Sequence, residues 1–326
     1  MIAAIFNTTH FLGRDMGGIE RAERGRALIG SDRDLAVEYD INALVIRRAA
    51  IGSAARQIMR QAGPKRTRLR RLGTLEAQGA DIDMVRRFIA LGVLDPGDLH
   101  RTLTLASGSK AELDAVGEEA RSLGAKVKLV HCRPDKLEDA DAMLAAALEA
   151  YGAVDQLVVA SGFNKAGFIH EMKYEDWQTV MDANVRGEWL MAKAVGSYWI
   201  KEKKRGKMLM MSSVRGRHGN ISGYTAYCAS KGATDALTRV LATEWAKYGI
   251  TVNAIAPTVF RSKLTAWMYG NDELGQATRA RSLARIPLGR LGEVEDLMGM
   301  ALYLLSPASD FCTGQVMYVD GGFTAG

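Results

Sequence analysis

From residue 101 onward, short β-branched or apolar runs alternate with longer amphipathic runs, and this alternation constrains the fold more than any other feature. Strand-like runs stand at 101–107, 126–132, 154–162, 206–213, 250–257 and 314–322, with helix-like runs between them. Strands separated by helices of this length predict a parallel sheet that is covered on both faces. We therefore expect an α/β, doubly wound, mainly parallel sheet, whose ligands bind at the carboxyl ends of the strands.

The first hundred residues lack this rhythm. Residues 20–34 and 47–63 could be helices, and no clean apolar strand stands out, although Ile41–Ile46 is a possible one. We therefore divide the chain into an atypical N-terminal region, residues 1–100, and a single α/β domain, residues 101–326. The N-terminal region is interpreted as a degenerate first strand and helix of that domain together with an insertion.

Composition narrows the class of protein. Of the 326 residues, 48% are hydrophobic and 25% charged, which is ordinary for a soluble globular chain. Neither a run long enough to span a bilayer nor a secretory leader stands out, so we expect no membrane association. Cys132, Cys228 and Cys312 are scattered without a C-x-x-C pair, which suggests neither a disulfide framework nor a metal site. These features predict a reducing, cytoplasmic location.

Basic residues are unevenly spread in this chain of formal charge +6. The densest run is Pro64–Arg71, with further arginines just before it. One interpretation is a patch for nucleic acid or an acidic partner, and the other is a solvated linker or helix face. No aromatic residues interleave the run for base stacking, which favours the solvated face over nucleic-acid binding.

The segment "GYTAYCASK", residues 223–231, holds the strongest catalytic signal. A phenol has a reference pKa of about 10 and needs help to act near neutrality. Lys231 follows Tyr227 by four residues, one helical turn along the same face, where its positive charge favours the phenolate. Tyr224 has only Cys228 at that spacing. We therefore assign the acid/base role to Tyr227, with a hydroxyl supplied from Ser212 and Ser213 at the preceding strand end.

The combination of these motifs resembles the short-chain dehydrogenase/reductase family, whose fold is Rossmann-like. The resemblance covers residues 101–322 and is carried by "SSVRGRHGNISGYTAYCASKGA", "DANVRG", "GITVNAIAP" and "PLGRLGEVEDLMGMALYLLSPASDFCTGQVMYVDGG". It implies that Tyr227 is the general acid/base, that Lys231 supports it and binds the nicotinamide ribose, that Ser213 orients the substrate oxygen, and that Asn184 holds a water in a proton relay. The serine–tyrosine gap is one residue longer than usual, and Ser213 is preferred over Ser212 as the second of the pair.

The resemblance also implies a nicotinamide cofactor, NAD or NADP, between which the sequence does not decide. The matching cofactor positions are Gly108, Ser161, Gly162, Lys231, Val259 and Ser262. Gly108 stands where a residue that selects the cofactor is often found, and Arg133 where an acid beside the adenine is often found. Residues 263–284 fall where the family carries its substrate lid. Trp267, Met268 and Tyr269 would cover the substrate there or pack in an interface.

The glycine-rich turn that such a cofactor needs is not recognisable. Its backbone amides would approach the pyrophosphate at a helix N-terminus. The segment with Gly13, Gly17 and Gly18 and the segment with Gly52 are the two candidates, and neither follows a good strand with all three glycines. Three explanations stay open: an unorthodox phosphate site, a first hundred residues derived from a shifted reading frame or rearranged gene, or a protein without catalytic activity.

Three function hypotheses follow. The first is an NAD(P)-dependent oxidoreductase that interconverts a secondary alcohol and a ketone. The second is a non-catalytic family member that acts as a binding or assembly module, and the third is a nucleic-acid-binding accessory. The resemblance is nearest to sugar-acid and polyol dehydrogenases, including the gluconate 5-dehydrogenase-like group, and it implies a small-molecule alcohol or ketone substrate. It also implies a homo-oligomer, a dimer or tetramer, through the helices around Asn184 and Tyr227.

Overall fold

The computed structural model describes residues 2–7, 102–261, 265, 268–270 and 273–326. All of them belong to one of the two units into which the chain divides, formed by residues 1–9 and 77–326. Several predictions lie outside the described residues: the possible strand Ile41–Ile46, the basic run Pro64–Arg71, both candidate glycine turns, Ser262 and Trp267.

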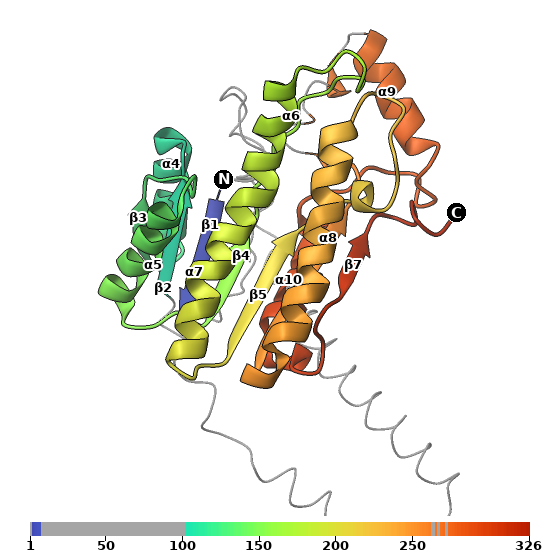
Figure 1. The fold of residues 1–326 in the computed structure, drawn as a ribbon. Coiled ribbons are helices and arrows are strands. Elements are labelled where there is room, and N and C mark those ends of the chain that lie inside the picture. Colours follow the sequence, from blue (N-terminus) through green and yellow to red (C-terminus); the bar gives the residue numbers. More distant parts are fainter. Residues whose placement is uncertain (1, 8–101, 262–264, 266–267, 271–272) are drawn as a thin grey trace, which may run out of the picture. The chain divides into compact units, whose positions relative to one another are not determined.

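Within the described residues, seven strands form one sheet in the order β3-β2-β1-β4-β5-β6-β7 (Figure 1). The strands are β1 (Ile2–Asn7), β2 (Thr102–Ser107), β3 (Lys126–Val130), β4 (Gln156–Val159), β5 (Gly206–Met211), β6 (Ile250–Pro257) and β7 (Val316–Val319). The pairs β2–β3, β4–β5, β5–β6 and β6–β7 are parallel. The expected doubly wound, mainly parallel sheet is therefore confirmed.

The first strand departs from the sequence prediction. No clean apolar strand stood out in the first hundred residues apart from the possible one at Ile41–Ile46, yet Ile2–Asn7 forms a strand in the central position between β2 and β4. It runs antiparallel to both neighbours, with Ala3 opposite Ala106 and Val159. Its last residue, Asn7, lies opposite Thr102, at the edge where β2 begins. The chain therefore leaves β1 at the sheet edge opposite the carboxyl ends of the parallel strands.

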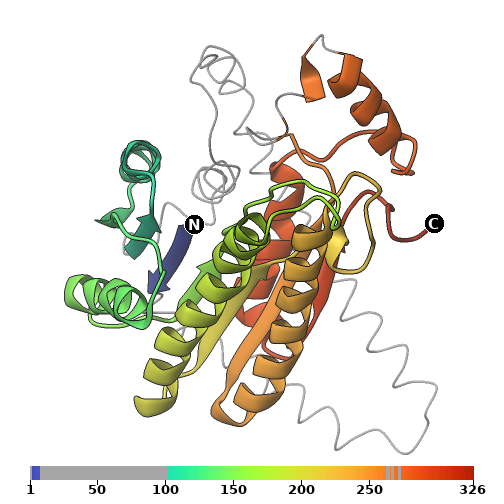
Figure 2. The same cartoon turned by 45° about the horizontal axis from the view of Figure 1, so that its top comes forward.

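Helices cover both faces of the sheet (Figures 1 and 2). On one face lie α4 (Lys110–Ser122) and α10 (Glu295–Leu305), and on the other α5 (Leu137–Tyr151), α7 (Gly187–Lys201) and α8 (Thr225–Trp245). Residues of β5 alternate between the two apolar clusters, Leu209 packing with α4 and α10, and Met208 and Met210 with the other helices. This alternation follows from the period of two along a strand.

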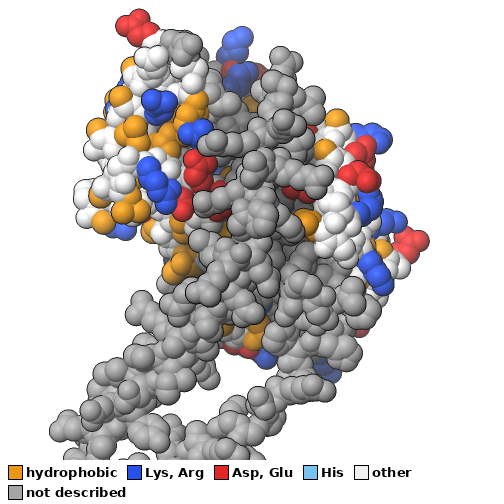
Figure 3. Space-filling view, turned by 180° about the vertical axis from the view of Figure 1, so that it is seen from behind, with side chains coloured by type: hydrophobic (Ala, Val, Ile, Leu, Met, Phe, Trp, Pro, Cys, Tyr) orange, Lys and Arg blue, Asp and Glu red, His pale blue; other side chains and the backbone are white. Residues whose placement is uncertain are grey.

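Shorter elements complete the described chain: α6 (Tyr174–Met181), the π-helix η3 (Asp182–Arg186), η4 (Val214–Gly216), η5 (Ala246–Tyr248), α9 (Glu273–Leu283) and η7 (Pro307–Ser309). Among the described residues, no helix is long and apolar enough to cross a membrane. Seen from behind, the visible described surface carries Lys and Arg side chains interspersed with Asp and Glu (Figure 3). That part of the surface is therefore mixed in charge.

The tryptophans on α7 and α8 separate into two environments. Trp199 is fully buried and donates from Nε1 to the Val154 carbonyl at 2.7 Å, and Trp245 is 9% exposed in the same apolar cluster. Trp189 is 46% exposed, with Lys193 Nζ 5.6 Å from its ring centroid. Core packing therefore accounts for two of the three, and Trp189 is the one on the surface.

Candidate active site

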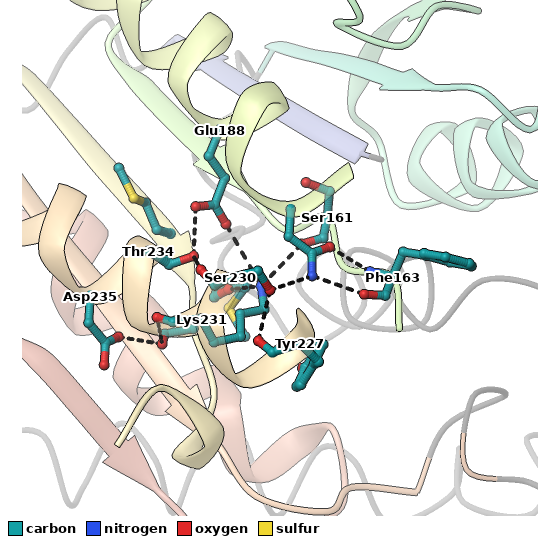
Figure 4. A network of polar contacts seen from close by, with 12 residues as sticks. Ser161, Phe163, Glu188, Tyr227, Ser230, Lys231, Thr234 and Asp235 are labelled. Atoms are coloured by element: carbon teal, nitrogen blue, oxygen red, sulfur yellow. Dashed lines mark hydrogen bonds and ion pairs between the residues drawn. The ribbon is translucent and has the colours of Figure 1, made fainter. Parts of the chain in front are cut away.

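The start of α8 brings Tyr227 and Lys231 together (Figure 4). Lys231 is 2% exposed, and its Nζ lies 6.0 Å from the centroid of the Tyr227 ring. The same ammonium donates to the Met211 carbonyl at 2.6 Å and to the Ser161 carbonyl at 3.5 Å. Buried carbonyls at the ends of β4 and β5 thus hold the lysine in place, one helical turn from the phenol.

The second tyrosine lies beside the first. The rings of Tyr224 and Tyr227 meet edge to face, with centroids 6.2 Å apart. Gly223, just before Tyr224, has a φ of +72°, and a Cβ there would lie 2.8 Å from the backbone of Gly167. The Gly167 amide donates to the Gly223 carbonyl at 2.7 Å. A residue without a side chain therefore lets the loop after β4 pack against the start of α8.

The two serines after β5 have different partners. Ser212 donates to the Asp235 carboxylate in a short hydrogen bond and contacts the Lys231 carbonyl at 3.4 Å, which ties it to α8. Ser213 accepts from the Arg215 amide at 3.2 Å, and its hydroxyl lies 3.4 Å from the Pro257 carbonyl at the end of β6. The Ser212 hydroxyl is thus committed to a carboxylate, whereas Ser213 has weaker partners at the carboxyl edge of the sheet.

Asn184 lies in the π-helix η3 and is fully buried. Its Oδ1 accepts from the Phe163 amide at 2.7 Å, and its Nδ2 donates to the Phe163 carbonyl at 2.9 Å and to Ser230 Oγ at 2.8 Å. Ser230 in turn donates to the Tyr227 carbonyl at 2.8 Å. π-bulges of this kind are frequent at functional sites. The Asn184 side chain therefore links the loop after β4 to the helix that carries Tyr227.

One buried acid belongs to this network although the sequence analysis did not single it out. Glu188 on α7 is fully buried, with Oε1 3.8 Å from Lys231 Nζ and Oε2 accepting from Thr234 Oγ1 at 2.7 Å (Figure 4). Burial raises the pKa of Glu188 to about 7, against the opposing effects of the Lys231 charge and the Thr234 hydrogen bond.

The helical phase of Glu188 could have revealed it. The residue stands four positions after Asn184 and three and seven before Met191 and Val195, all of them buried. These spacings place it on the buried face of the helix. A charged residue in that phase indicates a buried partner, because unpaired charges are costly to bury.

The residues expected to hold a cofactor fall into two groups. Ser161 is buried after β4, and Gly162 follows it. Val259 packs in an apolar cluster with Val214 and Phe323 after β6. These residues share the carboxyl edge with Lys231, whose ammonium contacts the Ser161 carbonyl.

Gly108 forms the second group, at the end of β2. The Arg133 side chain lies across it, because a Cβ on Gly108 would come within 2.4 Å of Arg133 Cδ. Arg133 also lies 3.8 Å from the Asp135 carboxylate, and both side chains are about half exposed. The Arg133 side chain thus lies over Gly108, the position at which the family resemblance implies a residue that selects the cofactor.

Two residues of the expected lid, Met268 and Tyr269, are buried or packed against other residues of the same domain. Met268 is 3% exposed, and Tyr269 joins the cluster of Val214 and Phe323. The Arg261 guanidinium lies 4.2 Å from the centroid of the Tyr269 ring, and burial raises the pKa of this phenol. Whether Met268 and Tyr269 also cover a substrate stays a prediction.

This arrangement suits proton transfer at one atom. A phenol lies beside a buried ammonium that backbone carbonyls hold in place, and a second hydroxyl, Ser213, ends the strand next to it. The phenol and the serine hydroxyl can each exchange a hydrogen bond with an oxygen of a bound molecule. The site can therefore give a proton to an oxygen atom or take one from it.

Comparison with known proteins gives matches over the same residues. A family model described as enoyl-(acyl carrier protein) reductase matches residues 101–324. An uncharacterised oxidoreductase of Mycobacterium tuberculosis is 52% identical over 228 residues, covering 70% of this chain and 84% of the relative. The 3-oxoacyl-[acyl-carrier-protein] reductase FabG of Thermotoga maritima is 34% identical, covering 66% and 84%. A solved gluconate 5-dehydrogenase of Burkholderia cenocepacia, in complex with NADP and tartrate, has a TM-score of 0.62 at 28% identity, covering 68% and 85%.

Proposed function

Because the chain belongs to the short-chain dehydrogenase/reductase family of oxidoreductases, we propose that it interconverts a secondary alcohol and a ketone with a nicotinamide cofactor, NAD or NADP. In this proposal Tyr227 is the general acid/base, Lys231 supports it, and Ser213 orients the substrate oxygen. The observation that carries the proposal is the pairing of Tyr227 with the buried Lys231 at the carboxyl edge of the sheet.

The described residues fit the nicotinamide half of such a cofactor. Ser161 Oγ and Thr258 Oγ1 are buried after β4 and β6, and neither has a hydrogen-bond partner among the described residues. Two free hydroxyls beside Lys231 and Val259 supply the polar contacts that a carboxamide and a ribose require. The two candidate pyrophosphate turns lie within residues 8–101, outside the described part of the chain.

The protein's own contribution is to hold an oxygen and move a proton. When bound, the cofactor supplies or accepts the hydride. Ser213 donates a hydrogen bond to the substrate oxygen, and Tyr227 protonates that oxygen in reduction or accepts its proton in oxidation. Lys231 stabilises the phenolate that remains after reduction. Asn184 fixes the loop after β4 against α8, which keeps Tyr227 at the edge of the sheet.

We propose a small polyhydroxy alcohol or sugar acid as the substrate class. The likeness to the gluconate 5-dehydrogenase supports this proposal. So does Arg215, which stands two residues after Ser213. Its half-buried guanidinium donates to the Gly219 carbonyl at 2.6 Å and forms no ion pair with a carboxylate among the described residues. Burial lowers the pKa of Arg215, yet a guanidinium stays charged, and an anionic group on the substrate would compensate that charge.

We also propose that the protein self-associates as a dimer or tetramer and resides in the cytoplasm. Exposed Trp189 on α7 and Val240 on α8 support an interface on these neighbouring helices. Light scattering of Trp189→Lys against the unmodified protein tests this. A smaller particle supports the proposal, and an unchanged particle mass contradicts it.

The test of the catalytic proposal compares two neighbouring tyrosines. We expect Tyr227→Phe to lower kcat/KM by about 10²- to 10⁴-fold, the usual range for loss of a general acid/base. The control, Tyr224→Phe, changes an adjacent ring and is expected to change kcat/KM by no more than about threefold. Gluconate with NAD or NADP is the first probe, followed through nicotinamide absorbance. Equal rates for both variants would contradict the role of Tyr227.

A non-catalytic binding module is the second candidate function, and the direction of β1 favours it. In a dinucleotide-binding sheet the phosphate turn follows the first strand at the carboxyl edge, whereas β1 here ends at the opposite edge. Titration with NADPH and NADH, followed by nicotinamide fluorescence, decides between the two. No binding of either at about millimolar concentration, the upper end of ordinary KM values, would leave the non-catalytic module as the better description.

A further inference from the structure

The Glu188 carboxyl group lies beside Lys231 at the base of the site, and the proposed mechanism gives it no role. It has no exposed surface, its Oε1 has no hydrogen-bond donor among the described residues, and its distance of 3.8 Å from Lys231 Nζ is long for a hydrogen bond. A buried carboxyl group in such a position is costly unless it is neutral or compensated. Lys231, the proposed partner of Tyr227, is the group that compensates it.

We propose that Glu188 is a positioning residue for the catalytic pair: it holds the Lys231 ammonium and, by gaining or losing a proton, sets how strongly that ammonium stabilises the Tyr227 phenolate. This inference rests on the proposed function, since it concerns the same lysine and tyrosine. Glu188 acts through Lys231, and no described contact joins it to Tyr227.

The groups around Glu188 define its titration. Lys231 and Asp235, both from α8, are the charged residues that act on it most strongly, and Thr234 donates its hydrogen bond. Elements α5, β4 and β5 also pack against α7, and no ion pair or hydrogen bond joins Glu188 to their described residues. Burial raises the pKa of Asp235 as well, and its carboxylate is held by Ser212. The ionisation of Glu188 is therefore tied first to the charge of Lys231.

The consequence for Tyr227 follows from the signs of the charges. Burial raises the pKa of Glu188 to about 7, so the carboxyl group is neutral below neutrality and ionised above it. When Glu188 is neutral, the full charge of Lys231 acts on the phenol. When Glu188 is ionised, its negative charge opposes part of that effect. Formation of the phenolate and ionisation of Glu188 therefore disfavour each other, as two coupled sites must.

The decisive variant is Glu188→Gln, which keeps the shape and the hydrogen bond from Thr234 but cannot ionise. Infrared difference spectra between wild type and Glu188→Gln, recorded from about pH 5 to about pH 9, should contain a protonated carboxyl band that vanishes with a midpoint near pH 7. Tyrosinate absorbance of Tyr227, isolated by subtracting the matching Tyr227→Phe variant, should appear at lower pH in Glu188→Gln, because the variant removes a negative charge beside Lys231. Glu244→Gln, an exposed acid on α8, is the control and should change neither signal.

A second variant guards against misfolding of the first. Thr234→Val removes the hydrogen bond that lowers the pKa of Glu188, so the infrared midpoint should move to higher pH. A carboxyl group that is fully ionised at pH 5 would overturn the proposal, as would identical Tyr227 titrations in wild type and Glu188→Gln. Both readouts are optical and need no turnover. An absence of oxidoreductase activity would therefore contradict the proposed function, whereas the two optical readouts would still test the role of Glu188.

Discussion

Replacement of Asn184 by alanine probes how the loop after β4 is attached to α8. The side chain is fully buried and makes three hydrogen bonds, two to the backbone of Phe163 and one to Ser230. A typical hydrogen bond contributes about 1 kcal/mol net, so Asn184→Ala should lower the free energy of unfolding by about 3 kcal/mol. Ser230 keeps its bond to the Tyr227 carbonyl, which limits the loss.

Scanning calorimetry measures this effect directly. For a unit of this size, about 3 kcal/mol corresponds to a fall in Tm of about 6 to 12 °C. The control is Gln178→Ala on the preceding helix, where a partly exposed carboxamide bonds to Asp182 at 2.7 Å and the change in Tm should stay within about 2 °C. A Tm for Asn184→Ala within about 2 °C of wild type would refute the assignment of the three bonds, because their loss could not then be so small.

Three further predictions concern Glu188, Gly223 and Arg133. Since the folded-state pKa of Glu188 is raised from 4.5 to about 7, its stabilising contribution is complete below about pH 4.5 and is lost by about pH 7. Urea unfolding should therefore show the stability of wild type, relative to Glu188→Gln, falling by up to about 3 kcal/mol across that interval, and parallel curves would contradict this. Gly223→Ala should lower Tm by several degrees, because its φ is +72° and the Gly167 backbone is close, whereas Gly219→Ala has open space and should be near neutral. Arg133→Ala should raise the Kd of NADPH about tenfold and that of NADH less, with Lys110→Ala as the control, and equal changes for the two nucleotides would argue against a phosphate contact.

Much of the described fold could be predicted from the sequence because local patterns and tertiary structure agree there. The runs around Thr102–Ser107 and Ile250–Pro257 are β-branched and apolar, and each became a buried strand in a parallel pair. The spacing of Tyr227 and Lys231 placed both on one helical face, and the structure brings the ammonium near the ring. Where one hydrophobic periodicity is strong, as in these segments, the sequence is sufficient to predict the secondary structure and the buried face.

The remaining features depend on contacts far apart in the chain. Neither the strand Ile2–Asn7 nor its direction is marked in its own residues, because β2 and β4 provide the hydrogen bonds that define it. Residue types alone do not reveal that the Asn184 side chain bonds to Phe163 and Ser230, and its expected role in holding a water stays a prediction. Glu188 carries a helical-phase signal, but its pairing with Lys231 requires the packing of α7 on α8.

The central place of β1 has a consequence for how the sheet assembles. Ala3 pairs with Ala106 and with Val159, so β1 leaves the ribosome about a hundred residues or more before the strands with which it pairs. Pairing over such distances in the chain is slow, because closing the long loop costs conformational entropy before any strand–strand contact stabilises the pair. Until then, or in a chain shortened by its first seven residues, β2 and β4 would present two unpaired edges to other chains. Such edges are templates for aggregation, so a few N-terminal residues protect the middle of the sheet.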